Sequence, residues 1–203
     1  MNRKTAIMQL RELNKLGSKM RLAAEDWDQE WKILISTIMS ARTRDEKTIS
    51  IALKLFQRYK TLEKLANAKL NNVKKIIKQI NFYKTKSKNI INCAKLLIKN
   101  YHGKIPDNIY ELIKLPGVGR KTANVFLSEN GKFGLAVDTH VFFVSKRLGW
   151  AESNHPHKVE EELKRLFPQK YWNKVNSTLV RFGKTYTSRK KKDEILSTIK
   201  NIK

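Results

Sequence analysis

Cysteine, proline and glycine are scarce in this sequence, and long apolar runs are missing. Its 203 residues include one cysteine, Cys93, together with four prolines and eight glycines. A single thiol can form neither a disulfide within the chain nor a metal site built on several cysteines. No stretch approaches the roughly 18 apolar residues that a membrane-spanning helix needs, and no apolar run of signal-peptide length follows the N-terminus. We therefore expect an intracellular protein of the cytoplasm, with no membrane partner and no bound metal.

Acidic residues are also few. Asp and Glu total 18 against 43 Lys and Arg, which gives a formal net charge of +25. This excess points to a polyanionic partner, with nucleic acid as the first candidate and an acidic membrane surface as the second. Lys, Asn and Ile are abundant throughout, so part of the charge reflects general composition. The charge supports nucleic-acid binding without establishing it.

Apolar residues recur with helical spacing along most of the chain. Residues 31–39 are apolar on most sides, which predicts a central buried helix. Cys93 lies in another such run and is predicted to be a small core residue. Residues 134–137 are the best strand candidate, but they are few, and sustained period-two alternation is absent. We therefore predict an all-α protein.

The sequence also indicates where particular helices begin and end. Asp107, after Pro106, is a plausible N-cap for the helix that follows. Residues 189–192 form a basic run, after which apolar residues return with helical spacing. This pattern predicts a C-terminal helix that packs on the protein, with an apolar stripe of Ile195, Leu196, Ile199 and Ile202.

A glycine-rich turn is the most informative local pattern. Residues 115–119 read Leu-Pro-Gly-Val-Gly and separate two helical segments. Gly117 and Gly119 permit positive φ and remove side-chain bulk, so that backbone N–H groups can converge on a phosphate oxygen. This helix-hairpin-helix pattern predicts sequence-independent contact with a DNA backbone, the alternative being a tight turn between two packed helices. The predicted contact residues are Gly117, Val118, Gly119, Arg120 and Thr122.

Two residues beyond the hairpin narrow the interpretation. Lys121 directly follows the turn, and Asp138 lies in the sequence Val-Asp-Thr-His-Val of residues 137–141. With the hairpin, they resemble the catalytic signature of the helix-hairpin-helix DNA glycosylases, specifically the endonuclease III family. The resemblance implies that Lys121 is the nucleophile, Asp138 its essential partner and His140 a DNA-binding residue. The alternatives are a solvated surface charge for Lys121, a helix N-cap for Asp138 and a packing role for His140.

The resemblance covers about residues 31–184 and implies two intercalating loops. Arg42 aligns with the polar residue that fills the hole left by a flipped base, and phosphate contact is its alternative role. Phe82 aligns with an apolar wedge between base pairs, and burial at a helix junction is its alternative. Asp45 matches an acid after the first loop, or caps the helix that starts at Glu46. A phosphate-binding rim near the second loop is predicted to comprise Lys84, Lys86 and Lys88.

By the same resemblance, the fold consists of two helical subdomains with an active-site cleft between them. Residues 24–131 would form a helical barrel that carries the hairpin, and residues 1–23 with 132–203 the second domain. Lys121 and Asp138 are expected to face each other across the cleft. The family's [4Fe–4S] cluster needs four cysteines near the C-terminus, so with Cys93 alone no cofactor is expected. Residues 189–192 would replace the basic loop of the cluster.

The function implied is that of a bifunctional DNA glycosylase and abasic-site lyase of base excision repair. It would act as a monomer on damaged pyrimidines in double-stranded DNA, through a lysine Schiff base and β-elimination. One alternative is a thymine–guanine mismatch glycosylase, which typically lacks a lysine at the position of Lys121. Another is a non-catalytic helix-hairpin-helix DNA-binding protein, which needs neither Lys121 nor Asp138. A basic membrane-surface protein ranks last, because the apolar stripes have the pattern of core stripes.

Overall fold

Helices make up the regular structure of the protein. The computed structural model describes residues 1–202, which form twelve α-helices and one 3-10 helix and contain no strand. The predicted all-α class is therefore confirmed. The chain divides into two compact units, which we call the terminal unit (Met1–Met20 with the chain from Phe133 onward) and the central unit (Arg21–Lys132).

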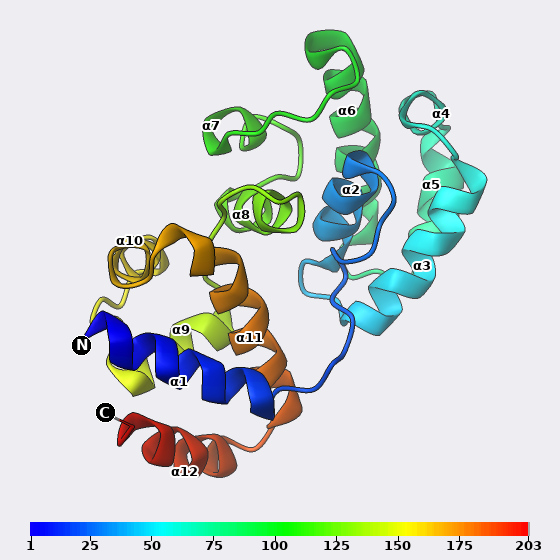
Figure 1. Ribbon diagram of the computed structural model, residues 1–203. Helices are drawn as coiled ribbons and strands as arrows, with labels where there is room; N and C mark the ends of the chain where they lie inside the picture. Colours follow the sequence, from blue (N-terminus) through cyan, green and yellow to red (C-terminus); the bar gives the residue numbers. More distant parts are fainter. Residues whose placement is uncertain (203) are drawn as a thin grey trace. The chain divides into compact units, whose positions relative to one another are not determined.

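The central unit holds seven helices in chain order (Figure 1). They are α2 (Glu30–Ser40), α3 (Asp45–Arg58), α4 (Leu62–Ala66), α5 (Leu70–Ile77), α6 (Tyr83–Tyr101), α7 (Ile109–Leu112) and α8 (Arg120–Glu129). Helix α2 packs against α3, α6 and α8, so it forms the centre of this unit. Within residues 31–39 every residue but Lys32 is buried, which confirms the predicted buried helix.

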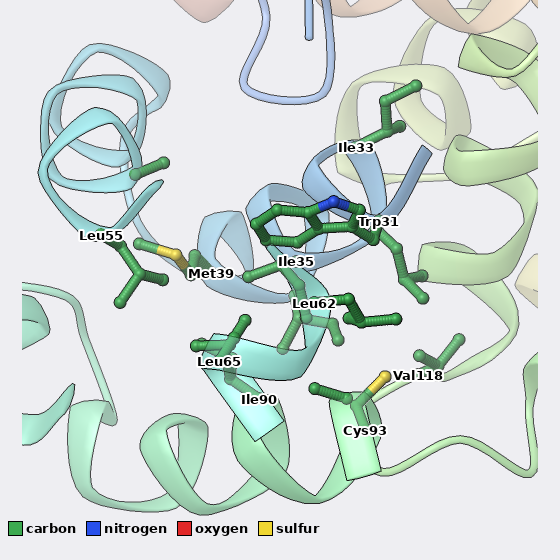
Figure 2. Packing of buried hydrophobic residues seen from close by; sticks show 14 of the residues in the cluster. Trp31, Ile33, Ile35, Met39, Leu55, Leu62, Leu65, Ile90, Cys93 and Val118 are labelled. Carbon is green, nitrogen blue, oxygen red and sulfur yellow. The ribbon is translucent and has the colours of Figure 1, made fainter. Parts of the chain in front are cut away.

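The core of the central unit is apolar and aromatic. Figure 2 shows Trp31 and Met39 of α2 among apolar side chains from α3, α4 and α6. Trp27 and Trp31 both pack edge-on against Phe56, with ring centres 4.9 and 5.2 Å away. Cys93 is fully buried in this core, which confirms its prediction, and burial raises the pKa of its thiol to about 12.

The terminal unit combines the two ends of the chain. Its helices are α1 (Arg3–Leu16), α9 (Thr139–Leu148), α10 (Pro156–Leu166), η1 (Gln169–Tyr171), α11 (Trp172–Thr185) and α12 (Arg189–Lys200). Helices α9 and α1 each contact both α11 and α12. Trp150 donates a hydrogen bond from Nε1 to Oε1 of the buried Gln9 at 2.7 Å. This bond satisfies the indole N–H, which is the one polar group of the Trp150 side chain. Leu196 and Ile199 of α12 are buried, so the C-terminal helix packs on the protein as predicted. Ile195 of the predicted stripe is only half-buried, and Ile202 lies beyond the end of the helix.

The strand candidate at residues 134–137 is irregular in the structure. No strand lies among residues 1–202 to pair with it, so its backbone groups need other partners. The side-chain amide of Asn176 in α11 donates to the carbonyl oxygen of Ala136 at 2.7 Å. This contact holds the buried loop that leads into α9. Among the described helices, none combines the length and apolar character required to cross a membrane.

Candidate active site

The hairpin predicted from sequence is present in the central unit, with α7 and α8 on either side of the turn. Helix α7 begins at Ile109, and its N-cap is Asn108, whose Oδ1 accepts from the backbone N–H of Glu111 at 3.0 Å. The prediction that Asp107 caps this helix was wrong by one position. Asp107 lies 3.6 Å from the ammonium of Lys132 instead, since Asn108 is the residue with extended backbone next to the first helical turn.

The absence of a side chain serves a different structural purpose at each of the two glycines of the turn. Gly117 has φ +83°, and a Cβ there would lie 3.0 Å from Cβ of Asn89 and 3.2 Å from Cγ2 of Ile38. The turn thus packs tightly onto α6 and α2 at this point, and only glycine fits. Gly119 has φ −94°, and a Cβ there would meet nothing within 4 Å. Its lack of a side chain leaves open space beside the turn that a phosphate could enter.

Lys121 is exposed in the first turn of α8, two residues after Gly119, which is the N-cap of the helix. Arg120 and Thr122 flank it and are half-buried. The first N–H groups of a helix have no partner within that helix, and the helix dipole places positive charge there. The hairpin therefore presents one lysine amine next to a backbone arrangement suited to an anion.

Asp138 lies in the terminal unit, where it is the N-cap of α9. Its Oδ1 accepts from the backbone N–H groups of His140 and Val141, both at 2.9 Å. The capping role considered from sequence is therefore confirmed. Because both hydrogen bonds end on the same oxygen, the cap also fixes the orientation of the carboxylate.

His140 follows Asp138 in the first turn of α9 and packs closely on α11. A Cβ at Gly183 of α11 would lie 2.2 Å from Nδ1 of His140 and 2.9 Å from its Cβ. The packing role that the sequence left open for His140 is thus present. Position 183 has room only for glycine, because the imidazole occupies the space where a side chain would begin.

The two loops predicted to intercalate are joined in the central unit. Arg42, after α2, and Phe82, before α6, have φ values of +56° and +59°, which non-glycine residues rarely adopt. The guanidinium of Arg42 lies over the Phe82 ring. Asn81 donates from its side-chain amide to the carbonyl of Arg42, and from its backbone to Oγ1 of Thr43 at 3.2 Å. Phe82 is 59% exposed, so the alternative of burial at a helix junction is wrong.

Lys86 does not belong to the predicted phosphate-binding rim. Its side chain is buried, and Nζ donates to the carbonyl oxygens of Met39 at 2.7 Å and Ala41 at 2.5 Å. These carbonyls belong to the end of α2 and the start of the Arg42 loop. Burial lowers the pKa of the Lys86 ammonium from its ordinary 10.5 to about 8. A neutral lysine amine still has two N–H groups, which matches the two carbonyl acceptors.

The remaining predicted residues fall into two groups. Lys84 and Lys88 are exposed on α6 beyond Phe82, as a rim requires. Asp45 is buried and is itself the first residue of α3, whose N-cap is Arg44, so the prediction of a cap before Glu46 was wrong.

Among residues 1–202, no three His, Cys, Asp or Glu side chains come together as a metal site would need.

Comparison with known proteins decides the family. Residues 35–169 match the HhH-GPD superfamily of base excision DNA repair proteins. Endonuclease III of Thermotoga maritima is 44% identical over 155 residues, which cover 76% of this chain and 73% of that protein. The chain belongs to the endonuclease III family.

Further members of the endonuclease III family agree with this assignment. Endonuclease III of Rickettsia felis is 40% identical over 177 residues, covering 86% of this chain and 82% of that protein. The solved structure of a trapped endonuclease III–DNA covalent intermediate has a TM-score of 0.84 at 31% identity, covering 93% of this chain and 89% of that chain. The chain is thus a DNA glycosylase of base excision repair with abasic-site lyase activity, as predicted.

Sequence reasoning missed the position of Lys86, although a signal was present. Lys84 and Lys88 are four residues apart and share one face of a helix, whereas Lys86 is two residues from each and points to the opposite side. Three lysines with this spacing cannot all line one rim. The helix period therefore separates Lys86 from the other two lysines, and the structure shows that Lys86 is the one that faces the interior.

Proposed function

We propose that this chain removes oxidised or ring-damaged pyrimidines from duplex DNA, with Lys121 as the nucleophile and Asp138 as its partner. The observation that carries the proposal is the position of Lys121. It is exposed in the first turn of α8, immediately after a turn with open space at Gly119. A phosphate bound by the hairpin would bring the neighbouring sugar close to the lysine amine.

The proposed reaction begins with the neutral amine of Lys121. Its lone pair attacks C1′, the bond from C1′ to the damaged base breaks, and the base leaves with the electron pair and a proton. Opening of the sugar ring gives a Schiff base between Lys121 and C1′. The Schiff base acidifies the 2′ proton, whose removal expels the 3′ phosphate by β-elimination. Hydrolysis of the Schiff base then frees Lys121.

Asp138 has the chemistry that this reaction requires. An ionised carboxylate stabilises the positive charge that develops on the sugar as the base departs, and it can accept and return protons. Its two hydrogen bonds from the backbone N–H groups of His140 and Val141 hold the carboxylate in place before substrate binds.

Damage is expected to be recognised by extrusion of the nucleotide from the duplex. We propose that Phe82 enters the base stack from one side and that Arg42 fills the space that the flipped base leaves. Both side chains are exposed on neighbouring loops, and the cation over the ring keeps them together. Lys84, Lys88, His140 and the hairpin residues Gly117 to Thr122 would contact the surrounding backbone.

We further propose that the enzyme works without a [4Fe–4S] cluster, as a monomer on cytoplasmic DNA. Four thiolate ligands cannot come from these 203 residues, whose one cysteine is the buried Cys93. Iron analysis and the visible spectrum of the purified protein test the first point, since a yellow-brown protein with bound iron would contradict it. Sedimentation with and without duplex DNA tests the monomer.

Borohydride trapping tests the mechanism. The substrate is a labelled duplex with one thymine glycol, incubated with wild type or Lys121→Ala in the presence of borohydride. Because borohydride reduces a Schiff base to a stable amine, wild type should give a covalent protein–DNA adduct and Lys121→Ala none. Lys99→Ala, an exposed lysine in the last turn of α6, is the matched control and should trap like wild type.

Two results would contradict the proposal. An adduct that persists in Lys121→Ala would move the nucleophile to another amine. An adduct on an abasic-site duplex but not on thymine glycol would keep Lys121 as the lyase residue and exclude this class of damaged pyrimidine as the substrate.

A further inference from the structure

Helix α11 contacts the segment around Asp138 on both sides of that residue. Before Asp138, the side-chain amide of Asn176 donates a hydrogen bond to the carbonyl oxygen of Ala136 at 2.7 Å. After Asp138, His140 packs against Gly183, where a Cβ would lie 2.6 Å from Cγ of the imidazole. Ala136 and His140 are each two residues away from Asp138. Asp138 therefore lies midway between two points of contact with one helix.

The spacing of the two contact residues on α11 explains how a single helix reaches both points. Asn176 and Gly183 are seven residues apart, which is close to two helical turns, so they share one face of α11. At 1.5 Å per residue they lie about 10 Å apart along the helix axis. Helix α11 is itself held by packing against α1 and α9. It therefore provides a rigid support for residues 136–140.

The hydrogen bond from Asn176 is made in the interior of the terminal unit. Asn176 is 7% exposed and Ala136 is fully buried. A buried carbonyl oxygen without a donor is costly, and among residues 1–202 there is no strand to supply one to this irregular loop. The amide of Asn176 thus replaces a backbone partner and fixes the path of the loop at Ala136.

The path of the loop matters because it leads directly to the carboxylate of Asp138. The cap hydrogen bonds from His140 and Val141 fix that carboxylate relative to α9. They do not fix the backbone that enters the cap, and the contact of Asn176 with Ala136 does. A displacement of about 1 Å in a group that acts on the reacting atoms can slow a reaction by about 100-fold.

We propose that Asn176 is a positioning residue for base excision and that it acts through Asp138. Its amide holds the loop before α9 so that the Asp138 carboxylate is aimed before substrate binds. His140, packed on Gly183, holds the first turn of α9 from the other side. Because Asn176 is buried, it acts through the loop and not on the DNA itself. The inference rests on the proposed function of Asp138.

A purely structural role for Asn176 predicts a different result, and α11 offers a matched control for it. Thr178 is also buried in α11, at 2% exposure, and its hydroxyl donates to Oδ1 of Asn14 in α1 at 3.2 Å. That bond joins α11 to α1 and does not involve the loop before Asp138. Thr178→Val therefore removes a buried hydrogen bond of the same helix and nearly keeps the shape of the side chain.

The test compares Asn176→Leu, which nearly keeps the size of the side chain but has no donor, with Thr178→Val. Asn176→Ser, which shortens the side chain, is measured alongside in case leucine prevents folding. Single-turnover excision is measured at saturating protein on a duplex with one thymine glycol. Affinity is measured by fluorescence anisotropy on a duplex with a tetrahydrofuran analogue of an abasic site, and thermal unfolding is followed in parallel. Asn176→Leu is also combined with Asp138→Asn.

Both Asn176 variants should lower the single-turnover rate by about 10-fold or more, while affinity for the abasic-site analogue stays within about twofold of wild type. Thr178→Val should keep the wild-type rate, although its unfolding midpoint falls as that of Asn176→Leu does. In the Asp138→Asn background, Asn176→Leu should change the rate by less than about twofold. A side chain that has already lost its charge loses nothing further when it is misplaced.

Three results would overturn the inference and leave the proposed function of Asp138 intact. The first is a wild-type rate in both Asn176 variants while Asp138→Asn is slow. The second is an equal loss of rate in the wild-type and Asp138→Asn backgrounds, because Asn176 would then act independently of Asp138. The third is a loss in Thr178→Val as large as that in Asn176→Leu, which would assign the effect to any buried bond of α11. Full activity of Asp138→Asn would instead contradict the proposed function, and this inference with it.

Discussion

The guanidinium carbon of Arg42 lies 5.1 Å from the centre of the Phe82 ring, although the two residues belong to different loops of the central unit. Both have a left-handed backbone, and Asn81 ties the second loop to the first through two hydrogen bonds. A cation–π contact and these hydrogen bonds make the two loops a single exposed element. Movement of one loop should therefore move the other.

Phe82→Ala should slow base excision with little loss of stability. The side chain is 59% exposed, so truncation removes little buried area. Loss of a wedge that offsets part of the cost of unstacking should reduce the single-turnover rate by about 10- to 100-fold. The rate on thymine glycol, and the fluorescence of 2-aminopurine next to the lesion, measure this effect. Tyr110→Ala is the control, since Tyr110 is an aromatic residue with 73% exposure. Equal rates for the Phe82 variant and wild type would exclude a wedge.

Lys86→Met should change the way stability depends on pH. The folded pKa of Lys86 is about 8 against an ordinary value of 10.5, so between these values the unfolded chain binds more protons than the folded one. The free energy of unfolding of wild type should therefore rise relative to Lys86→Met between pH 8 and 10.5, by on the order of 2 kcal/mol. Urea denaturation at several pH values measures the difference.

Lys84→Met is the control for that series. Lys84 is exposed on the same helix, so its loss should leave the pH dependence of stability unchanged. Lys86→Met should also slow excision, since two carbonyls at the end of α2 lose their donor and the Arg42 loop loses an anchor. A difference between wild type and Lys86→Met that is constant with pH would show that the folded ammonium is not desolvated.

The two glycines of the hairpin should respond to alanine in opposite ways. Gly117→Ala should lower the free energy of unfolding by about 2 kcal/mol, because it forces a side chain into positive φ and against Asn89 and Ile38. Gly119→Ala should change stability by less than about 0.5 kcal/mol, because no atom lies within 4 Å of the new Cβ. It should nevertheless weaken duplex binding about tenfold, since the methyl group occupies the path of a phosphate. Unchanged binding by Gly119→Ala would show that DNA does not approach the hairpin on this side.

Asp138→Asn and Asp138→Ala together separate capping from catalysis. Asparagine can still accept the two hydrogen bonds from His140 and Val141, so its thermal midpoint should match wild type. Alanine cannot, and it should lose about 1 kcal/mol. Both variants should lose excision activity by about 100-fold or more if the carboxylate charge stabilises the reacting sugar. Full activity in Asp138→Asn would limit the residue to its cap.

The sequence predicted elements whose cause is local. The helix period identified the buried helix at residues 31–39, and Cys93 and the buried Leu196 and Ile199 of α12 lie where that period placed them. Asp138 caps α9 because its type and position satisfy a short-range rule. Features that depend on distant partners were not predictable in this way. Residues 134–137 have no strand among residues 1–202 to pair with, and an amide from α11 takes one of their carbonyls instead. Position 183 must be glycine because His140 occupies its space.

In the candidate site, too, features with a local cause were predictable from the sequence, and contacts between distant segments were not. The order of residues in the sequence places Lys121 just after the hairpin, and in the structure it lies in the first turn of α8. The contact of Arg42 with Phe82 and the hydrogen bonds of Lys86 to Met39 and Ala41 join segments that are about 40–47 residues apart, so no local pattern predicts these partners. The choice of Asn108 over Asp107 as N-cap was a difference of one residue between two good capping types.

Burial of Cys93 has a consequence for a protein that deals with DNA damage. Peroxide and related oxidants attack the thiolate form of cysteine, and they need access to the sulfur. The thiol of Cys93 stays protonated at physiological pH and has no exposed surface. The folded protein therefore offers no reactive cysteine sulfur. The oxidants that create damaged bases leave the Cys93 side chain chemically intact.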